Sequence, residues 1–308
     1  MAVSLTMRIG KLTLQNPVMV ASGTFGYGDE YARLINVEKL GAIITKSITL
    51  APRAGNPPPR IWETASGMLN AIGLQNVGCE AFIRDKMPFL RSLRGPKILV
   101  NLAGESMAEY VELARRLDDV PGIDGFELNI SCPNCDRGGL EFGVDPKLTH
   151  EVVRRVRRVT RKFLMPKLSP NVTDVVVIAR AAVEGGADAL SLINTLVAIA
   201  IDAKSRRPRI STVQGGLSGP AIKPVALRMV WQVHRALPRV PVVGLGGIMT
   251  AQDAAEFLVC GASAVQIGTA NYVNPRGALG IIDGLARYLA QQRVSRVTQV
   301  VGTLKDRQ

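Results

Sequence analysis

Residues 241–269 read PVVGLGGIMTAQDAAEFLVCGASAVQIGT, and they contain two strand patterns separated by one helix pattern. The runs at 241–245 and 264–267 are short and apolar, as buried strands are. Thr250 is a residue type that begins helices, and Gly261 is one that ends them. Glycine follows each strand run directly. The stretch therefore predicts a β-α-β unit of a parallel sheet.

The same unit recurs along the chain. Further strand runs lie at 17–20, 42–45, 97–101, 124–130, 164–168 and 188–193, and an amphipathic helical pattern follows each of them. Polar N-cap residues that mark helix starts are expected at Asp29, Asn76, Ser106, Thr149, Thr173 or Asp174, and Thr250. The repeat predicts an α/β fold, a (β/α)8 TIM barrel that occupies residues 1–308 as a single domain. An open doubly wound sheet is the alternative, but no GxGxxG follows the first strand.

Three segments exceed the minimal repeat. They are an N-terminal hairpin at 5–14 and two long loops, at 48–75 and 194–219. Loops of this length in a compact domain usually serve function, so we expect them to lie over the carboxyl ends of the strands.

Composition excludes several classes of protein. The 308 residues are 47% hydrophobic and 20% charged, which excludes disorder. The N-terminus lacks a signal-peptide pattern, and the longest apolar run, 189–201, is shorter than the roughly 20 residues of a membrane span. Four scattered cysteines favour a reducing, cytoplasmic location. The net charge of +13 does not by itself choose a partner.

Small, amide and lysine residues follow the predicted strands, where a barrel carries its active site. Lys46 and Lys167 predict an anionic ligand, although carbonyl groups or solvent could satisfy them instead. Asn101, Asn129 and Asn194 suit the edge of a heterocycle. The absence of histidine and carboxylate residues at these ends argues against a metal site.

Glycines follow the last two strands. Gly246-Gly247 and Gly268-Thr269 occupy the positions where barrels bind phosphate through backbone N–H groups. Either pair alone could serve only a tight turn, but the two pairs together favour a phosphate site.

Cys132 and Cys135 form a CxxC pattern. A redox dithiol or half of a zinc site are both compatible with it, but the chain has only two histidines and no second CxxC. A single thiol at Cys132, with an ordinary pKa of about 8.5, fits a general base or acid better.

With these residues in hand, the chain resembles the dihydroorotate dehydrogenases, specifically the cytosolic group with a cysteine base. NISCPN at 129–134 and NAIGLQN at 70–76 are similar to the family's signature segments. Lys46-Ser47, Lys167, INT at 193–195, GGLSGP at 215–220, GLGG at 244–247 and GT at 268–269 match in order. The resemblance covers essentially the whole chain.

The resemblance implies one FMN per chain, which takes a hydride from dihydroorotate. The implied FMN contacts are Ala21, Ser22, Lys46, Ser47, Asn101, Asn129, Lys167, Ile193, Gly219, Gly246, Gly247, Gly268 and Thr269. The implied orotate contacts are Lys46, Asn70, Ala71, Ile72, Gly73, Leu74, Asn129, Asn134, Asn194 and Thr195. Cys132 would remove the C5 proton as hydride leaves C6, and Lys167 would stabilise negative charge on the reduced flavin.

The segment GGLEFGVDP at 138–146 is similar to the NAD-linked type of the family rather than to the fumarate-reducing homodimer. The chain has no GxGxxG and no cysteine cluster for an iron–sulfur centre. The resemblance therefore implies a heterotetramer, in which a homodimer of this chain passes electrons to NAD+ through a partner subunit with FAD and a 2Fe–2S cluster. Cys135 matches no role in the family.

Two other functions compete with this one. tRNA dihydrouridine synthases resemble FMN barrels with a similar cysteine, and a +13 chain would suit RNA. They carry a helical domain after the barrel, whereas only about 40 residues follow the last strand here. A basic barrel that only binds a partner would leave the strand-end lysines, asparagines and thiol unexplained. We therefore expect dihydroorotate oxidation in pyrimidine biosynthesis, with neither nucleic acid nor membrane as a partner.

Overall fold

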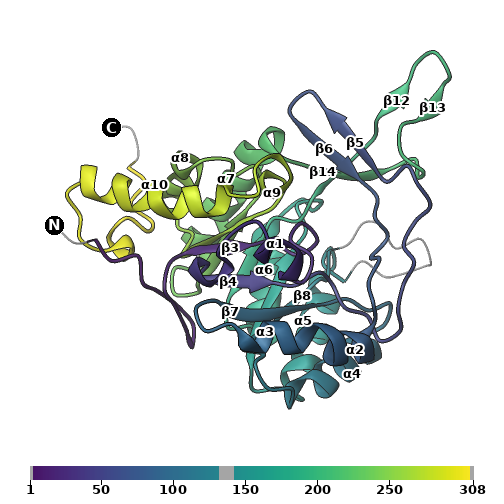
Figure 1. Ribbon diagram of the computed structural model, residues 1–308, viewed down its shortest axis with the longest axis horizontal. Coiled ribbons are helices and arrows are strands. Elements are labelled where there is room, and N and C mark those ends of the chain that lie inside the picture. Colours follow the sequence, from purple (N-terminus) through teal and green to yellow (C-terminus); the bar gives the residue numbers. More distant parts are fainter. Residues whose placement is uncertain (1–2, 132–141, 306–308) are drawn as a thin grey trace.

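Eight parallel strands form a closed barrel at the centre of the molecule (Figure 1). The computed structural model describes residues 3–131 and 142–305. Around the barrel the strands follow chain order, and the last pairs with the first. They are β3 (Val18–Val20), β4 (Ala42–Ile44), β7 (Lys97–Leu102), β8 (Gly125–Leu128), β9 (Phe163–Leu168), β10 (Leu190–Leu192), β15 (Val242–Leu245) and β16 (Ala264–Ile267). The predicted barrel and all eight predicted strand regions are confirmed.

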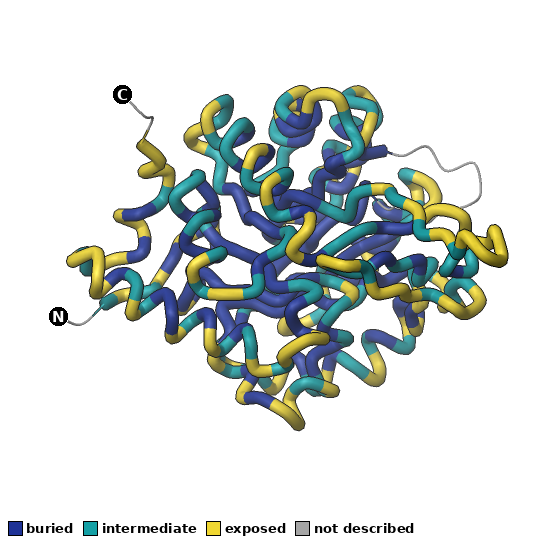
Figure 2. Tube along the Cα trace, turned by 90° about the horizontal axis from the view of Figure 1, so that it is seen from above, coloured by how far each residue is buried: buried dark blue, intermediate teal, exposed yellow. Residues whose placement is uncertain are grey.

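Helices surround the barrel, so that buried strands lie inside an exposed outer surface (Figure 2). After β3 and β4 the helical segments are short: α1 (Asp29–Ala32) with a 3-10 turn (Val37–Lys39), and α2 (Cys79–Ala81) and α3 (Met87–Ser92) joined by a π turn (Phe82–Lys86). The others are α4 (Met107–Asp118), α5 (Pro146–Arg157), α6 (Val175–Glu184), α7 (Lys223–Ala236), α8 (Ala251–Val259), α9 (Ala270–Val273) and α10 (Gly277–Gln291). Across the described ranges, no helix combines the length and apolarity needed to cross a membrane.

The predicted helix starts are partly confirmed. Ser106, Asp174 and Thr250 each accept a backbone N–H of the first helical turn, as predicted. Thr149 was the wrong start, because α5 begins three residues earlier, where the Asp145 side chain caps the helix and Pro146 occupies its first position. Thr149 instead lies buried within the helix.

Two further predicted N-cap residues are wrong by one or two residues. Gly28 and Gly78, both with positive φ, precede α1 and α2 in place of Asp29 and Asn76. The buried Asn76 side chain accepts the N–H groups of Thr49 and Gly78, so it holds the loop before the helix rather than the helix itself.

The sequence of α5 separates a buried face from a charged face. Val152, Val153 and Val156 are fully buried against the barrel. On the outer face, Glu151 pairs with Arg154 and Arg155, both at 2.7 Å. The helix thus has the amphipathic pattern expected after each strand, and its arginines belong to a solvated outer surface.

The two long excursions join in one antiparallel sheet, although the sequence predicted loops. Its strands are β5 (Ile61–Thr64), β6 (Gly67–Asn70), β11 (Leu196–Ala198) and β14 (Gly215–Ser218), in the order β11-β14-β6-β5. We call this the cover sheet. Gly67 lies so close to β14 that a Cβ there would be 2.1 Å from the Ser218 carbonyl oxygen.

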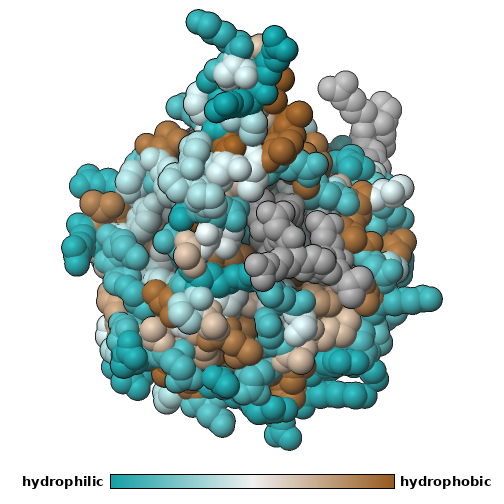
Figure 3. All heavy atoms as spheres, turned by 90° about the vertical axis from the view of Figure 1, so that its right-hand side faces the viewer, coloured by the Kyte–Doolittle hydropathy of each residue, from teal (hydrophilic) through white to brown (hydrophobic). Residues whose placement is uncertain are grey.

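Two hairpins complete the fold. β1 (Met7–Ile9) and β2 (Leu12–Leu14) form the predicted N-terminal hairpin. A Cβ at its Gly10 would lie 3.3 Å from the Asp188 carbonyl oxygen and 3.4 Å from the Phe163 ring, near the amino-terminal ends of the barrel strands. β12 (Ile201–Asp202) and β13 (Arg207–Pro208) form a second hairpin that projects from the cover sheet (Figure 1). Apolar side chains are exposed near this projection (Figure 3). The two hairpins thus lie at opposite ends of the barrel.

We expect Gly67→Ala to separate β6 from β14, because the new methyl group would collide with backbone. Limited proteolysis should then cut residues 48–75 or 194–219 faster than in the wild type. Gly280→Ala is the matched control, since its Cβ meets nothing within 4 Å in the interior of α10. That variant should be more stable by about 0.5–1 kcal/mol. Equal protease resistance of Gly67→Ala and the wild type would contradict the close pairing.

Candidate active site

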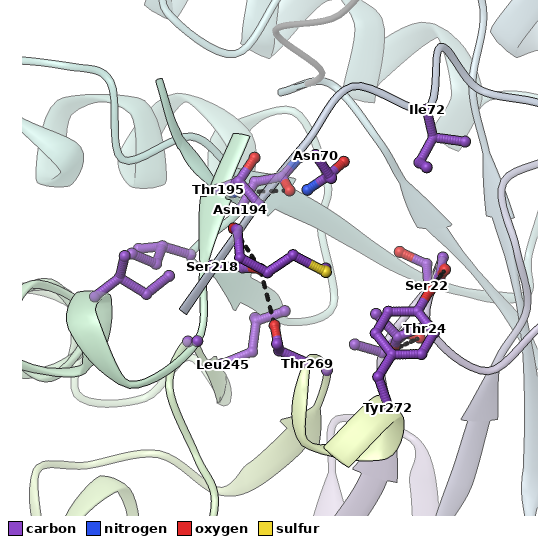
Figure 4. Close-up of a pocket in the computed structure, with 18 of the residues that line it drawn as sticks. Ser22, Thr24, Asn70, Ile72, Asn194, Thr195, Ser218, Leu245, Thr269 and Tyr272 are labelled. Atoms are coloured by element: carbon purple, nitrogen blue, oxygen red, sulfur yellow. Dashed lines mark hydrogen bonds between the residues drawn. The ribbon is translucent and has the colours of Figure 1, made fainter. Parts of the chain in front are cut away.

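A cavity lies between the carboxyl ends of the barrel strands and the cover sheet (Figure 4). The barrel contributes residues at or just after β3, β4, β8, β9, β10, β15 and β16, while Ile61, Met68, Asn70 and Ser218 come from the cover sheet. The cavity is therefore built from the end of the barrel that carries chemistry in this fold.

Most of the residues singled out in the sequence line this cavity. They are Ala21, Ser22, Lys46, Ser47, Asn70, Ile72, Gly73, Leu74, Asn129, Lys167, Ile193, Asn194, Thr195, Gly219, Gly246, Gly247, Gly268 and Thr269. Asn101 and Ala71 do not line it, since both are fully buried. Asn101 lies behind Ser47, and Ala71 packs with Leu69 and Ile210 inside the cover-sheet region. Cys132, Asn134 and Cys135 lie outside the described residues.

Glycine backbone forms one end of the cavity. Gly246 and Gly247, directly after β15, have φ values of 123° and 77°, which disfavour other residues. A Cβ on Gly247 would lie 2.8 Å from the Gly219 carbonyl oxygen, so the two loops approach closely. Thr269 donates a hydrogen bond to the Ser218 hydroxyl at 2.8 Å, which ties the β16 loop to the cover sheet. Three loops with accessible backbone thus converge on one place.

Two lysines reach the cavity from β4 and β9. Burial lowers the pKa of Lys46 from its usual 10.5, and nearby Arg60 lowers it further while Glu30 opposes the shift. Lys167 is 5% exposed, and its Nζ lies 3.5 Å from the Ser22 hydroxyl. Both positions suit an anionic ligand or a developing negative charge.

Amide and hydroxyl groups line the floor of the cavity. The side-chain amide of Asn194 donates to the Ser131 hydroxyl at 2.9 Å. The same amide nitrogen lies 3.4 Å from Oδ1 of Asn129. The Tyr110 hydroxyl, from α4, donates to the backbone carbonyl of Asn129 at 2.6 Å. Asn70 donates to the Gly216 carbonyl at 3.0 Å and so links the two excursions at the cavity.

Sequence reasoning missed several lining residues. Met68 and Ser218 belong to the cover sheet, whose long-range pairing has no local signal. Tyr272 lies in α9 and donates to the Gly23 carbonyl at 3.0 Å, across the mouth of the site (Figure 4). Its place three residues after Gly268-Thr269 was the signal that could have identified it. In the described part of the chain, no three His, Cys, Asp or Glu side chains gather as a metal site.

Fold and cavity together define a barrel enzyme with a ligand site at the carboxyl rim of its strands. The model of the family described as dihydroorotate dehydrogenase matches residues 4–289. The catalytic subunit of dihydroorotate dehydrogenase B (NAD(+)) from Geotalea daltonii is 58% identical over 301 residues, covering 98% of each chain. The corresponding subunits from Pelobacter propionicus and Geobacter sulfurreducens are 57% and 55% identical, again with 98% of each chain covered. The chain belongs to the dihydroorotate dehydrogenase family of oxidoreductases.

We expect Lys46→Met to stabilise the ligand-free protein, because it removes a charge whose burial is unfavourable. Since the folded state holds this proton less tightly than the unfolded state, wild-type stability should gain from rising pH between the lowered pKa and 10.5. In the variant, the free energy of unfolding should no longer rise with pH over that range. Denaturant unfolding at several pH values measures both effects.

Lys204→Met, in the projecting hairpin, is the control, because Lys204 is exposed and its substitution should leave stability nearly unchanged. A Lys46→Met protein less stable than the wild type would mean that Lys46 is stabilised by its surroundings.

Proposed function

We propose that this chain oxidises dihydroorotate to orotate, with FMN bound in the cavity as hydride acceptor. The observation that carries the proposal is the joint presence, in one cavity at the strand ends, of two lysines, a row of amides and a glycine-lined end. Such a cavity suits one ligand with a phosphate and a flat heterocycle, and beside it a second ligand with a carboxylate. Family membership supports the same reaction.

The cavity fits FMN by its chemistry. The positive φ of Gly246 and Gly247 and the close approach of Gly219 bring backbone to the wall where a phosphate can accept N–H bonds. The residues proposed to contact FMN are Ala21, Ser22, Lys46, Ser47, Asn129, Lys167, Ile193, Gly219, Gly246, Gly247, Gly268 and Thr269. Asn101 acts behind Ser47 instead of in the wall. When bound, FMN supplies two-electron redox chemistry that side chains lack.

The substrate would lie between the amide row and the cover sheet. Lys46 suits its carboxylate, and the amides of Asn70, Asn129 and Asn194 suit its pyrimidine edge. Ile72, Gly73, Leu74 and Thr195 also line this part of the cavity. Ala71 supports the segment from within the fold, and Asn134 is carried over from the sequence alone.

Three residues would perform the chemistry. Cys132 is proposed to take the proton from C5 of the substrate as thiolate. Lys167 places a positive charge in the cavity wall, where it stabilises negative charge that develops during the reaction. Asn129 and its partners keep the substrate oriented relative to both.

The relatives' names support an electron-transfer partner, because each of those proteins is called a catalytic subunit of an NAD(+) enzyme. We infer a homodimer of this chain, one domain per protomer, joined to an iron–sulfur flavoprotein with FAD and a 2Fe–2S cluster. The product would enter cytoplasmic pyrimidine biosynthesis.

Anaerobic addition of dihydroorotate to the purified protein tests the proposal. The protein should be yellow with FMN, and the flavin absorbance should bleach. A colourless protein that binds no FMN would contradict the proposal, and bleaching by NADPH but not by dihydroorotate would favour a tRNA dihydrouridine synthase-like reductase. Rapid turnover with fumarate by this chain alone would contradict the NAD-linked assignment.

We expect Lys46→Met to weaken orotate binding about tenfold or more, since a charge-assisted hydrogen bond contributes about 1.5–3 kcal/mol. Titration of the flavin absorbance with orotate measures the dissociation constant. Lys204→Met should bind orotate like the wild type, and an unchanged constant in Lys46→Met would remove Lys46 from the substrate site.

We expect Cys132→Ala to slow flavin reduction by dihydroorotate about 100-fold or more, because a general base contributes that much. The wild-type rate should rise with pH toward the ordinary thiol pKa of about 8.5. Anaerobic stopped-flow measures both, and Cys79→Ala, which removes a buried thiol outside the cavity, is the control. A wild-type rate in Cys132→Ala would exclude the thiol as base.

A further inference from the structure

A carboxylate lies inside the barrel, beneath the floor of the cavity. Glu127, in β8, is fully buried, in a place that barrels normally fill with branched apolar side chains. Three neutral side chains donate to it: Asn101 at 2.7 Å, Gln266 at 2.7 Å and Ser191 at 2.9 Å. Because these partners come from β7, β16 and β10, the carboxylate lies within the ring of strands. Burial of a carboxylate is costly unless its hydrogen bonds are made, and here three donors make them.

Glu127 sets the direction of a chain of hydrogen bonds. A carboxylate can only accept, so Asn101 must turn its amide nitrogen toward Glu127 and its oxygen toward Ser47. The Ser47 hydroxyl therefore donates its one proton to Asn101, at 2.5 Å. Asn129 Nδ2 follows, 3.4 Å from Ser47 Oγ. Every donor points inward, from Asn129 to Ser47, Asn101 and Glu127.

This direction has a consequence at the cavity, which Ser47 and Asn129 line. Since the Ser47 proton points away from the cavity, the hydroxyl can present only a lone pair to a ligand. Hydrogen bonds that point the same way polarise one another, so part of the negative charge of Glu127 is felt at Ser47 Oγ.

We propose that Glu127 is a positioning residue that acts through Asn101 on Ser47, so that the cavity floor offers a hydrogen-bond acceptor with partial negative charge to the bound flavin. The inference rests on the proposed function, because it requires FMN in this cavity. Negative charge beside a flavin disfavours the uptake of electrons. Glu127 thus lowers the reduction potential of the flavin, in opposition to Lys167.

The test removes the negative charge from position 127 and then restores it at position 101, one step closer to Ser47. Glu127→Gln removes the charge, so the midpoint potential of the bound flavin should become more positive. In the double variant Glu127→Gln with Asn101→Asp, the new carboxylate at position 101 accepts from Ser47 and from the new amide at position 127. The potential should then return to the wild-type value or fall below it. A purely structural role predicts instead that the double variant is more disturbed than the single one.

Two further variants keep the test decisive. Asn101→Ala cuts the chain while Glu127 stays, and its potential should also become more positive. Ser191→Ala is the matched control, because it removes one buried hydrogen bond to Glu127 on the side that does not lead to the cavity, and the potential should barely change. Should Glu127→Gln fail to fold, Asn101→Ala and the double variant still give opposite predictions.

Spectroelectrochemical titration of the FMN-loaded protein gives the potentials, and thermal unfolding of each variant reports the loss of stability separately. An unchanged potential in Glu127→Gln or Asn101→Ala, or a double variant shifted further in the positive direction, would overturn the inference. A wild-type protein that binds no FMN would overturn the proposed function instead. If FMN binds and dihydroorotate reduces it while the potentials do not move, only the role of Glu127 fails.

Discussion

The pairing of β16 with β3 closes the sheet, and the position of the polar groups that follow the barrel strands depends on that closure. Parallel strands in a closed ring direct all their carboxyl ends to one rim, so residues from Ser22 to Thr269 meet there although most of the chain separates them. Closure also creates an interior that water does not reach. Glu127 can hold its hydrogen bonds in a fixed arrangement only because strands from around the ring supply the donors.

The cover sheet closes the site from above, and it depends on pairing between distant segments. Hydrogen bonds from Asn70 to Gly216 and from Ser218 to Met68 join residues about 150 positions apart. Such contacts carry a larger entropic cost than local ones, which the close glycine-mediated approach of β6 and β14 helps to offset. Since this pairing contributes Met68, Asn70 and Ser218 to the cavity wall, the complete site requires the cover sheet to be formed.

These features explain what the sequence could predict. Apolar runs with glycine and polar flanks located all eight barrel strands, and the rule that chemistry follows the strand ends located most cavity residues. Thr149 failed as a helix start because Asp145-Pro146 supplies an earlier one. The cover sheet could not be predicted, because no local pattern specifies which strands pair.

Glu127 was missed for a different physical reason. Phe126-Glu127-Leu128 alternates apolar and polar residues, which in an exposed sheet would direct Glu127 to solvent. A parallel barrel strand is buried on both faces, so the alternation did not reveal that Glu127 points into the barrel. The position of Asn101 at a strand end, together with the family resemblance, suggested a place in the cavity wall, whereas its side chain lies one layer deeper and connects Ser47 to the carboxylate.

Charge in the site is arranged in two layers. Lys46 and Lys167 bring positive charge to the cavity wall, and the deeper carboxylate of Glu127 opposes it from inside the barrel. If the lysines acted alone, the site would bind anions tightly and, with the proposed FMN bound, would favour the reduced flavin. A buried negative charge, conveyed by oriented hydrogen bonds and screened little by solvent, is a way to moderate that bias without occupying the cavity. On this proposal, the barrel interior contributes to the chemistry of the site as well as to its stability.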